Sequence, residues 1–317
     1  MKKKTRALII LSFLFIIVGS IGAVLTYAKA YDSVYVTQQE TISINGIKKI
    51  NLTGSSATIQ VAKTHAKELS VKIEGLDTNA TAYQLSSSKK GDQLNLAIKE
   101  HKQRSNTVLD FLQFENVRIT LEVPESIDLL ALDTTAGMVS IDHLALSDVI
   151  ITTDSGDVSV AESQLANLSI QTSAGTTYLD QSSIQKVAVD SDSGSTYFNE
   201  VITKETAVTT DSGQIDFSQV AGNLSAQADT GTISLANHTL NQETAFTTHF
   251  GTIYVTTEQL PSDLLVTTST NFGSVSLFDK SVPAAQFGEG SHSMKLKTDT
   301  GDISVLTEHE EEEFENN

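Results

Sequence analysis

The chain has 317 residues, a formal net charge of −18, no cysteine and no tryptophan. The absence of cysteine excludes disulfide bonds, thiolate metal sites and a cysteine nucleophile. Hydrophobic residues make up 39% of the chain, enough for a buried core. The abundance of Thr, Ser, Val and Ile favours β-strands, because β-branched side chains suit a pleated surface.

The N-terminal segment, residues 1–30, predicts a basic cytoplasmic tip and one transmembrane helix. Four basic residues within positions 2–6 precede an uncharged, apolar run from Ala7 to Ala28. A helix of this length crosses the hydrocarbon core of a bilayer. Positive charge before the span places the N-terminus in the cytoplasm and the body outside, as in a single-pass signal anchor of the cell membrane. The alternative is a cleaved signal peptide, because Ala28-Lys29-Ala30 resembles an A-x-A cleavage site.

The remaining chain is strongly acidic. Residues 31–317 contain 16 basic and 39 acidic residues, a formal charge of −23. Such a body repels nucleic acid and attracts cations and cationic peptides, although the same charge also serves solubility alone. The last residues, 307–317, include a run of glutamates and are expected to form a disordered, solvated tail.

Residues 31–125 predict β-rich N-terminal coils and a cap. Segments 94–98 and 117–124 alternate apolar and polar residues, and 50–61 is a weaker copy of the unit that recurs further along the chain. A repeat structure needs such an end cap, because an open sheet edge invites aggregation.

Residues 126–306 carry a repeat of about nineteen residues. The segment Thr153-Asp154-Ser155-Gly156 recurs at Thr210 and, with Thr in place of Ser, at Thr298. Nine marker glycines are spaced by 19, 19, 19, 19, 18, 20, 22 and 28 residues: Gly137, Gly156, Gly175, Gly194, Gly213, Gly231, Gly251, Gly273 and Gly301. We expect each to form a structural turn.

Each unit predicts two short strands joined by a corner. In the unit of Gly156, the expected inward residues are Ile151 and Thr153 before the glycine and Val158 and Val160 after it. The alternation changes parity at the glycine, so the chain turns there.

Two architectures fit such a unit. One is an all-β, single-stranded parallel β-solenoid, or β-helix, in which each rung stacks about 4.8 Å from the previous one. The other is a meander of hairpins with Asp-Ser-Gly tips. The solenoid is favoured, because only there does each residue lie on its own copy in the next rung.

These motifs resemble a bacterial family of β-strand-repeat surface domains of unknown function, called "putative adhesin". The resemblance rests on Leu52-Thr53-Gly54, on Val123-Pro124-Glu125 and on the Thr-Asp-Ser-Gly units, and it covers roughly residues 40–306. It implies a surface-binding role and supplies no catalytic residues. It also implies a connection with envelope-stress signalling.

The Asp-Ser-Gly and Asp-Thr-Gly triplets are also the signature of aspartic proteases. They occur five times, at Asp154, Asp192, Asp211, Asp229 and Asp299. Proteolysis needs two carboxylates that face each other, whereas a solenoid arranges these five along one edge. The sequence therefore predicts no enzyme.

The same edge is a candidate for divalent cations. Rows of carboxylates suit Ca²⁺, and the candidate ligands are Asp154, Asp192, Asp211 and Asp229. The favoured interpretation is that each aspartate caps its own turn, so the sequence predicts no metal site and no cofactor, with Ca²⁺ as the alternative.

Four phenylalanines are candidate contact residues. Phe250 and Phe272 each precede a marker glycine and are expected at equivalent corners of adjacent rungs, where they either bind a ligand or cover the corner. Phe111 and Phe114 lie in an apolar stretch next to the basic run 99–104, which is either a partner contact or a cap. The loop 280–293 interrupts the repeat before its last unit.

The sequence as a whole predicts a membrane-anchored, extracellular, adhesin-like binding or structural module of the cell envelope. The ligand is an envelope component, protein or peptide. The alternative is an envelope-stress sensor or regulator that binds a neighbouring membrane protein or a cationic peptide.

Overall fold

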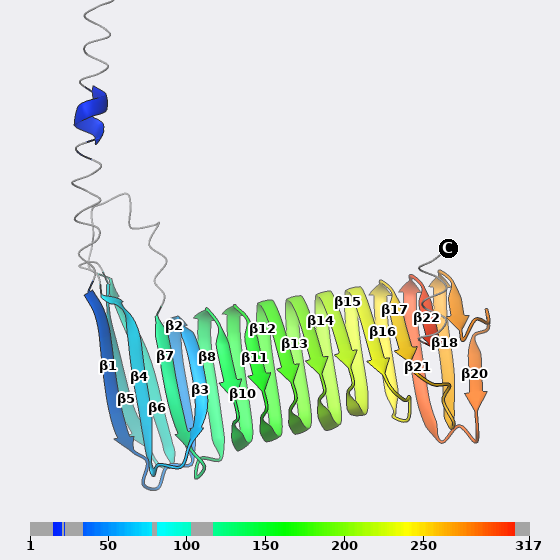
Figure 1. Cartoon of the computed structure of the whole chain (residues 1–317), viewed down its shortest axis with the longest axis horizontal. Helices are drawn as coiled ribbons and strands as arrows, with labels where there is room; N and C mark the ends of the chain where they lie inside the picture. The colour runs from blue at the N-terminus through cyan, green and yellow to red at the C-terminus, as the bar shows by residue number, and fades with distance from the viewer. Residues whose placement is uncertain (1–14, 21, 23–33, 78–80, 103–116, 308–317) are drawn as a thin grey trace, which may run out of the picture.

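The computed structural model describes residues 15–20, 22, 34–77, 81–102 and 117–307, and Figure 1 shows most of them as one rod of β-strands. Among these described residues, no helix combines the length and the hydropathy that a membrane crossing requires. The predicted membrane helix at 7–28 lies mostly outside the described residues. So do Phe111, Phe114 and nearly all of the predicted tail.

The centre of the rod is a parallel solenoid. From β8 to β14 each paired residue lies nineteen places further along the chain, as Ile170 pairs with Val189 and Val189 with Val208. This parallel register excludes the hairpin meander. The strands are β8 (Leu129–Ala136), β9 (Val139–Asp142), β10 (Ala145–Ser155), β11 (Val158–Ala161), β12 (Gln164–Asp180), β13 (Ser183–Asn199), β14 (Ile202–Ser218) and β15 (Ala221–Asn237).

The core is a narrow layer between the two strand segments of each rung. Burial alternates along β13 and changes parity at the marker glycine, as the repeat predicts. Three phenylalanines stack along the rod axis inside this layer. The ring centroids of Phe198 and Phe217 are 4.9 Å apart, and those of Phe217 and Phe246 are 5.5 Å apart. Like residues of successive rungs therefore stack on one another and fill the narrow space between the two strand segments.

The marker glycines form one column at the first corner of the rungs. Gly175 has φ of 130°, and a Cβ placed on it would lie 2.1 Å from the carbonyl oxygen of Gly156. Each of the other marker glycines approaches the residue below it in the same way. A side chain has no room here, which explains why glycine recurs in every unit.

At the N-terminal end, the rung order differs from the chain order. The rung of β2 (Lys49–Ser56) and β3 (Thr58–Thr64) stacks directly on β8 and β9, with Ala57 below Gly137. Outside it lie β6 (Gln93–Lys102) and β7 (Arg118–Pro124). Antiparallel strands β5 (Thr81–Lys90), β4 (Glu68–Asp77) and β1 (Val34–Ser43) complete this end.

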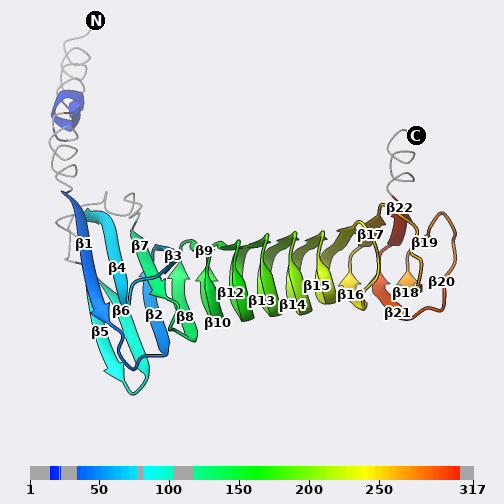
Figure 2. The ribbon, with the colours of Figure 1, turned by 60° about the horizontal axis from the view of Figure 1, so that its bottom comes forward.

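At the C-terminal end, the last two rungs are exchanged. The final strands, β21 (His292–Thr300) and β22 (Ile303–Thr307), insert between the rung of β16 (Thr244–Phe250) and β17 (Ile253–Thr257) and the rung of β18 (Leu264–Phe272) and β19 (Val275–Leu277). Strand β20 (Ala284–Phe287) pairs antiparallel with β18 at the end of the rod. Figures 1 and 2 show β21 between β16 and β18.

This exchange corrects one prediction. Phe250 and Phe272 both pair with Thr300, so a whole rung separates them. They are not neighbours in an aromatic stack. The expectation of adjacent rungs was wrong because chain order does not determine stacking order when a long loop precedes the last rung.

Candidate functional site

The surface of the rod consists of columns, because every rung exposes the same positions. We call the outward side chains before the marker glycines the first face, and those after them the second face. The first corner carries the glycines, and the second corner joins one rung to the next. A binding site on this molecule is therefore assembled from side chains of consecutive rungs.

A shallow groove of about 410 Å³ runs across four rungs of the first face. Its exposed floor consists of Ile150, Ser169, Ala188 and Ala207. Polar side chains form one wall: Asn167 Nδ2 donates to Asp148 Oδ1 at 2.6 Å, and Lys186 Nζ lies 3.1 Å from Glu205 Oε2. One pair is a hydrogen bond and the other an ion pair, so the wall is polar and keeps a formal charge of −1 from Asp148.

The predicted aspartate column lies at the first corner, with all four side chains exposed. Asp192, Asp211 and Asp229 occupy consecutive rungs, whereas Ser173 separates Asp154 from them. Among the described residues, no three of these carboxylates lie within 4.8 Å of one another. The aspartates therefore form a row, not a closed cation site.

The capping bonds at this corner come from other aspartates. Asp157 Oδ1 accepts the backbone N–H of Thr176 at 2.9 Å, and Asp302 Oδ1 accepts that of Ser274 at 2.7 Å. Both acceptors immediately follow a marker glycine, and each bonds to an adjacent rung. The Ser274 backbone N–H, followed by its hydroxyl, lowers the pKa of Asp302.

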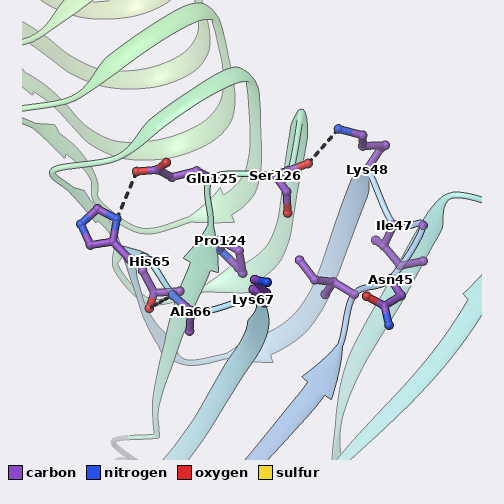
Figure 3. Close-up of a pocket in the computed structure, with 12 residues that line it drawn as sticks. Asn45, Ile47, Lys48, His65, Ala66, Lys67, Pro124, Glu125 and Ser126 are labelled. Atoms are coloured by element: carbon purple, nitrogen blue, oxygen red, sulfur yellow. Dashed lines mark hydrogen bonds and ion pairs between the residues drawn. The ribbon is translucent and has the colours of Figure 1, made fainter.

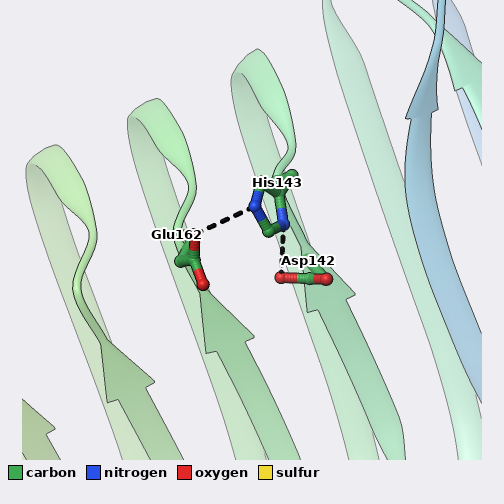
Figure 4. Close-up of side chains that lie close together, drawn as sticks. All are labelled: Asp142, His143 and Glu162. Carbon is green, nitrogen blue, oxygen red and sulfur yellow. Dashed lines mark ion pairs between the residues drawn. The ribbon is translucent and has the colours of Figure 1, made fainter.

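One group of three possible metal ligands exists among the described residues: Asp142, His143 and Glu162 at the second corner (Figure 4). His143 has φ of 51°, and its ring bridges the two carboxylates. The Nδ1 atom lies 2.8 Å from Asp142 Oδ1, and the Nε2 atom lies 2.9 Å from Glu162 Oε2. A metal ion would have to displace one of these contacts, and all three side chains are exposed. Ion pairing by itself accounts for the arrangement.

A hollow of about 480 Å³ lies between three chain reversals near the N-terminal end (Figure 3). Lys48 Nζ donates to Ser126 O at 3.1 Å. Lys63, 2.6 Å from Glu125, lowers the pKa of that carboxyl by its hydrogen bond and its charge, with a smaller contribution from His65. Of the charged side chains lining the hollow in the described residues, Lys67 is the one without an ion pair. The hollow therefore offers little net charge to a ligand.

The sequence reasoning missed an aromatic pair on the second face. The rings of Tyr178 and Tyr197 stack with centroids 5.1 Å apart and an interplanar angle of 13°. Both stand three places after a marker glycine, so the repeat register itself could have revealed them. The sequence did predict Phe250 and Phe272 as contact residues. They are 63% and 75% exposed, and they do not stack on each other. Phe111 and Phe114 lie outside the described residues.

The family model described as Toastrack DUF4097 matches residues 47–306. This match confirms the resemblance drawn from the repeat units. No curated protein matches the chain.

Several solved structures are similar to the chain, each with low sequence identity. A "putative adhesin" from Bacteroides fragilis has 14% identity and a TM-score of 0.45, with 85% of this chain and 97% of that chain covered. A "putative cell adhesion protein" from Clostridium sporogenes has 11% identity and a TM-score of 0.32, with 87% and 100% covered. A "putative lipid binding protein" from Parabacteroides distasonis has 14% identity and a TM-score of 0.43, with 86% and 96% covered.

Proposed function

Because the chain belongs to the Toastrack DUF4097 family, we propose that it is a non-enzymatic, adhesin-like binding module of the cell envelope. One observation carries the proposal: the first face repeats the same groove position over four rungs, beside a wall of polar side chains that pair with one another. A surface with a rung spacing of about 4.8 Å suits an extended, regular ligand.

The proposed location is the outer side of the cell membrane. The basic tip and the apolar run 7–28 support an N-terminal anchor with the body outside. An anchored rod holds its faces away from the bilayer, where an envelope component can reach them. Protease treatment of intact cells tests this: the body is expected to be degraded while the cytoplasmic tip is protected.

Binding of the full-length protein to isolated envelope fractions tests the function. We expect saturable binding that survives moderate salt, because the charged side chains of the groove wall, Asp148, Lys186 and Glu205, sum to a formal charge of only −1. Ala188→Tyr fills the groove floor on an exposed position and should reduce binding. Ser218→Tyr adds the same side chain to the second face and serves as the matched control. Equal binding by both variants would contradict a role for the groove.

A second candidate function is a sensor of cationic peptides. It is favoured by the row of Asp192, Asp211 and Asp229 in consecutive rungs and by the charge of −23 on residues 31–317. Charge-driven binding weakens as salt rises. Binding to cationic peptides alone, lost at moderate salt, would therefore favour this function over the first.

A further inference from the structure

The rings of Tyr178 and Tyr197 lie on the second face and stack on each other along the rod axis. Their centroid separation of 5.1 Å is close to the spacing of the paired strands β12 and β13 that carry them. Each ring therefore turns one face to its partner and the other face along the rod. Beyond Tyr197 the next residue in the column is Asp216, and beyond Tyr178 it is Ser159.

The surface drops in height beside Tyr178. Ser159 pairs with Ser140 of the next rung, so two consecutive positions carry short side chains. These two rungs span about 10 Å along the rod. Tyr178 is 47% exposed, in agreement with a ring that has one free face. We call the surface formed by Tyr178, Ser159 and Ser140 the tyrosine step.

Polar and apolar groups border the tyrosine step on the side of the first corner. Asp157 lies there and uses Oδ1 to accept the Thr176 N–H, and within the described part of the chain its second carboxylate oxygen remains available. Met138, 44% exposed, lies beside it on the next rung. An aromatic face with hydroxyls and a carboxylate at its edge matches a sugar ring, which has an apolar C–H face and a rim of hydroxyl donors.

We propose that the tyrosine step binds one pyranose ring of an envelope glycan, stacked on the free face of Tyr178. The ligand is a neutral or amino sugar, because Asp157 and the charge of −23 on residues 31–317 repel an acidic one. Dispersion and burial of the ring face supply the attraction, and Asp157 and the two serines set the orientation. This site goes beyond the proposed function and does not depend on the groove of the first face.

The test uses the full-length protein and three probes: tetra-N-acetylchitotetraose, its deacetylated amino-sugar tetramer and tetragalacturonic acid. The chain has 7 tyrosines and no tryptophan, so tyrosine emission and saturation-transfer NMR report ring stacking directly. We expect the neutral or the amino-sugar tetramer to bind and the acidic one to bind at least about tenfold more weakly.

Variants at exposed positions locate the site. Tyr178→Ser combined with Tyr197→Ser removes both rings and should weaken binding by about tenfold or more. A single substitution would only uncover Tyr197. Ser159→Leu keeps both tyrosines but fills the step, and it should also abolish binding without lowering the melting temperature. Ile202→Ser removes an exposed apolar side chain elsewhere and should leave binding unchanged.

Two results would overturn the proposal: no binding of either the neutral or the amino-sugar tetramer by the wild type, or undiminished binding by the double tyrosine variant. Envelope binding that Ala188→Tyr abolishes but the double tyrosine variant retains would preserve the proposed function and reject the tyrosine step. The two ideas therefore fail separately.

Discussion

The Nδ1 atom of His249 lies 3.3 Å from Oδ2 of Asp299, although the whole rung of Asn271 separates them in the sequence. The other ring nitrogen of His249 lies 4.0 Å from Asp229. The exchange of the last two rungs produces this arrangement. Asn271 then follows on the far side and donates to Asp299 Oδ1 at 3.3 Å. The exchange thus places Asp299 between a histidine and an amide, and both side chains contact its carboxylate.

Engineered disulfides test the rung exchange directly, because the chain contains no cysteine. Phe250→Cys with Thr300→Cys joins two exposed partners of adjacent strands, within the Cα separation that a disulfide requires. We expect this pair to close on mild oxidation at low protein concentration, as measured by mass spectrometry. Phe250→Cys with Phe272→Cys lies two rungs apart, about 10 Å, and should stay reduced. Closure of the second pair but not the first would show that the rungs stack in chain order.

The glycine column predicts a steep cost for one methyl group. Gly175→Ala would put a Cβ 2.1 Å from the carbonyl oxygen of Gly156 and 2.7 Å from its carbonyl carbon, both backbone atoms. We expect it to lower the free energy of unfolding by about 3 kcal/mol or more, measured by urea denaturation. Gly91→Ala is the control, because Gly91 also has positive φ, 62°, but no atom of the described residues lies within 4 Å of the added one. Strain of the backbone alone should cost about 1 kcal/mol there. Equal losses would mean that conformation, not close approach, selects glycine.

The contrast between these two glycines shows what the sequence could and could not reveal. The recurrence of Gly175 in a column predicted strands, corner and inward positions, because stacking requires the same residue in every rung. The recurrence does not determine the order in which the rungs stack. The spacings of 22 and 28 residues mark where loops become long enough for the exchange, but they do not specify its partner.

The candidate sites show the same limit. From the sequence alone, Asp154 and Asp157 are equally able to cap a turn. In the structure, Asp157 accepts the backbone N–H of Thr176. The choice depends on the direction of the backbone N–H in the next rung, which local pattern does not encode. Tyr178 and Tyr197 share one register position and were in principle predictable.

Buried serines at the second corner predict a specific loss. Ser163 Oγ accepts the Leu144 N–H at 3.1 Å and donates to Ala161 O at 2.7 Å. Ser163→Ala leaves the buried N–H of Leu144 without its partner, which should cost about 1–3 kcal/mol in the free energy of unfolding. Ser169→Ala, on the exposed first face, should be nearly neutral in the same denaturation series. A loss as large at Ser169 would indicate that the effect reflects strand propensity.

Acid should weaken the C-terminal end of the rod. The pKa of Asp302 lies below its ordinary value of 3.8, because the Ser274 backbone N–H and hydroxyl both donate to the carboxylate. The pKa of Glu243 is likewise lowered, chiefly by the hydroxyl of Ser293. A carboxyl whose pKa is lower in the folded state stabilises the fold above its unfolded pKa, and this contribution disappears as the pH falls through the folded value.

Melting curves of Asp302→Asn against pH isolate this contribution at one residue. Asparagine keeps the acceptor oxygen but removes the titrating charge, so the wild type should melt at a higher temperature than the variant at pH 7. The two melting temperatures should converge as the pH falls below about 3.8, the ordinary aspartate value. Asp154→Asn removes an exposed carboxylate of the same corner and should lower the melting temperature little at either pH. If the gap between the wild type and Asp302→Asn stayed constant across this range, the charge of Asp302 would not be what holds Ser274, and the attachment of β22 to β19 would rest on the backbone ladder alone.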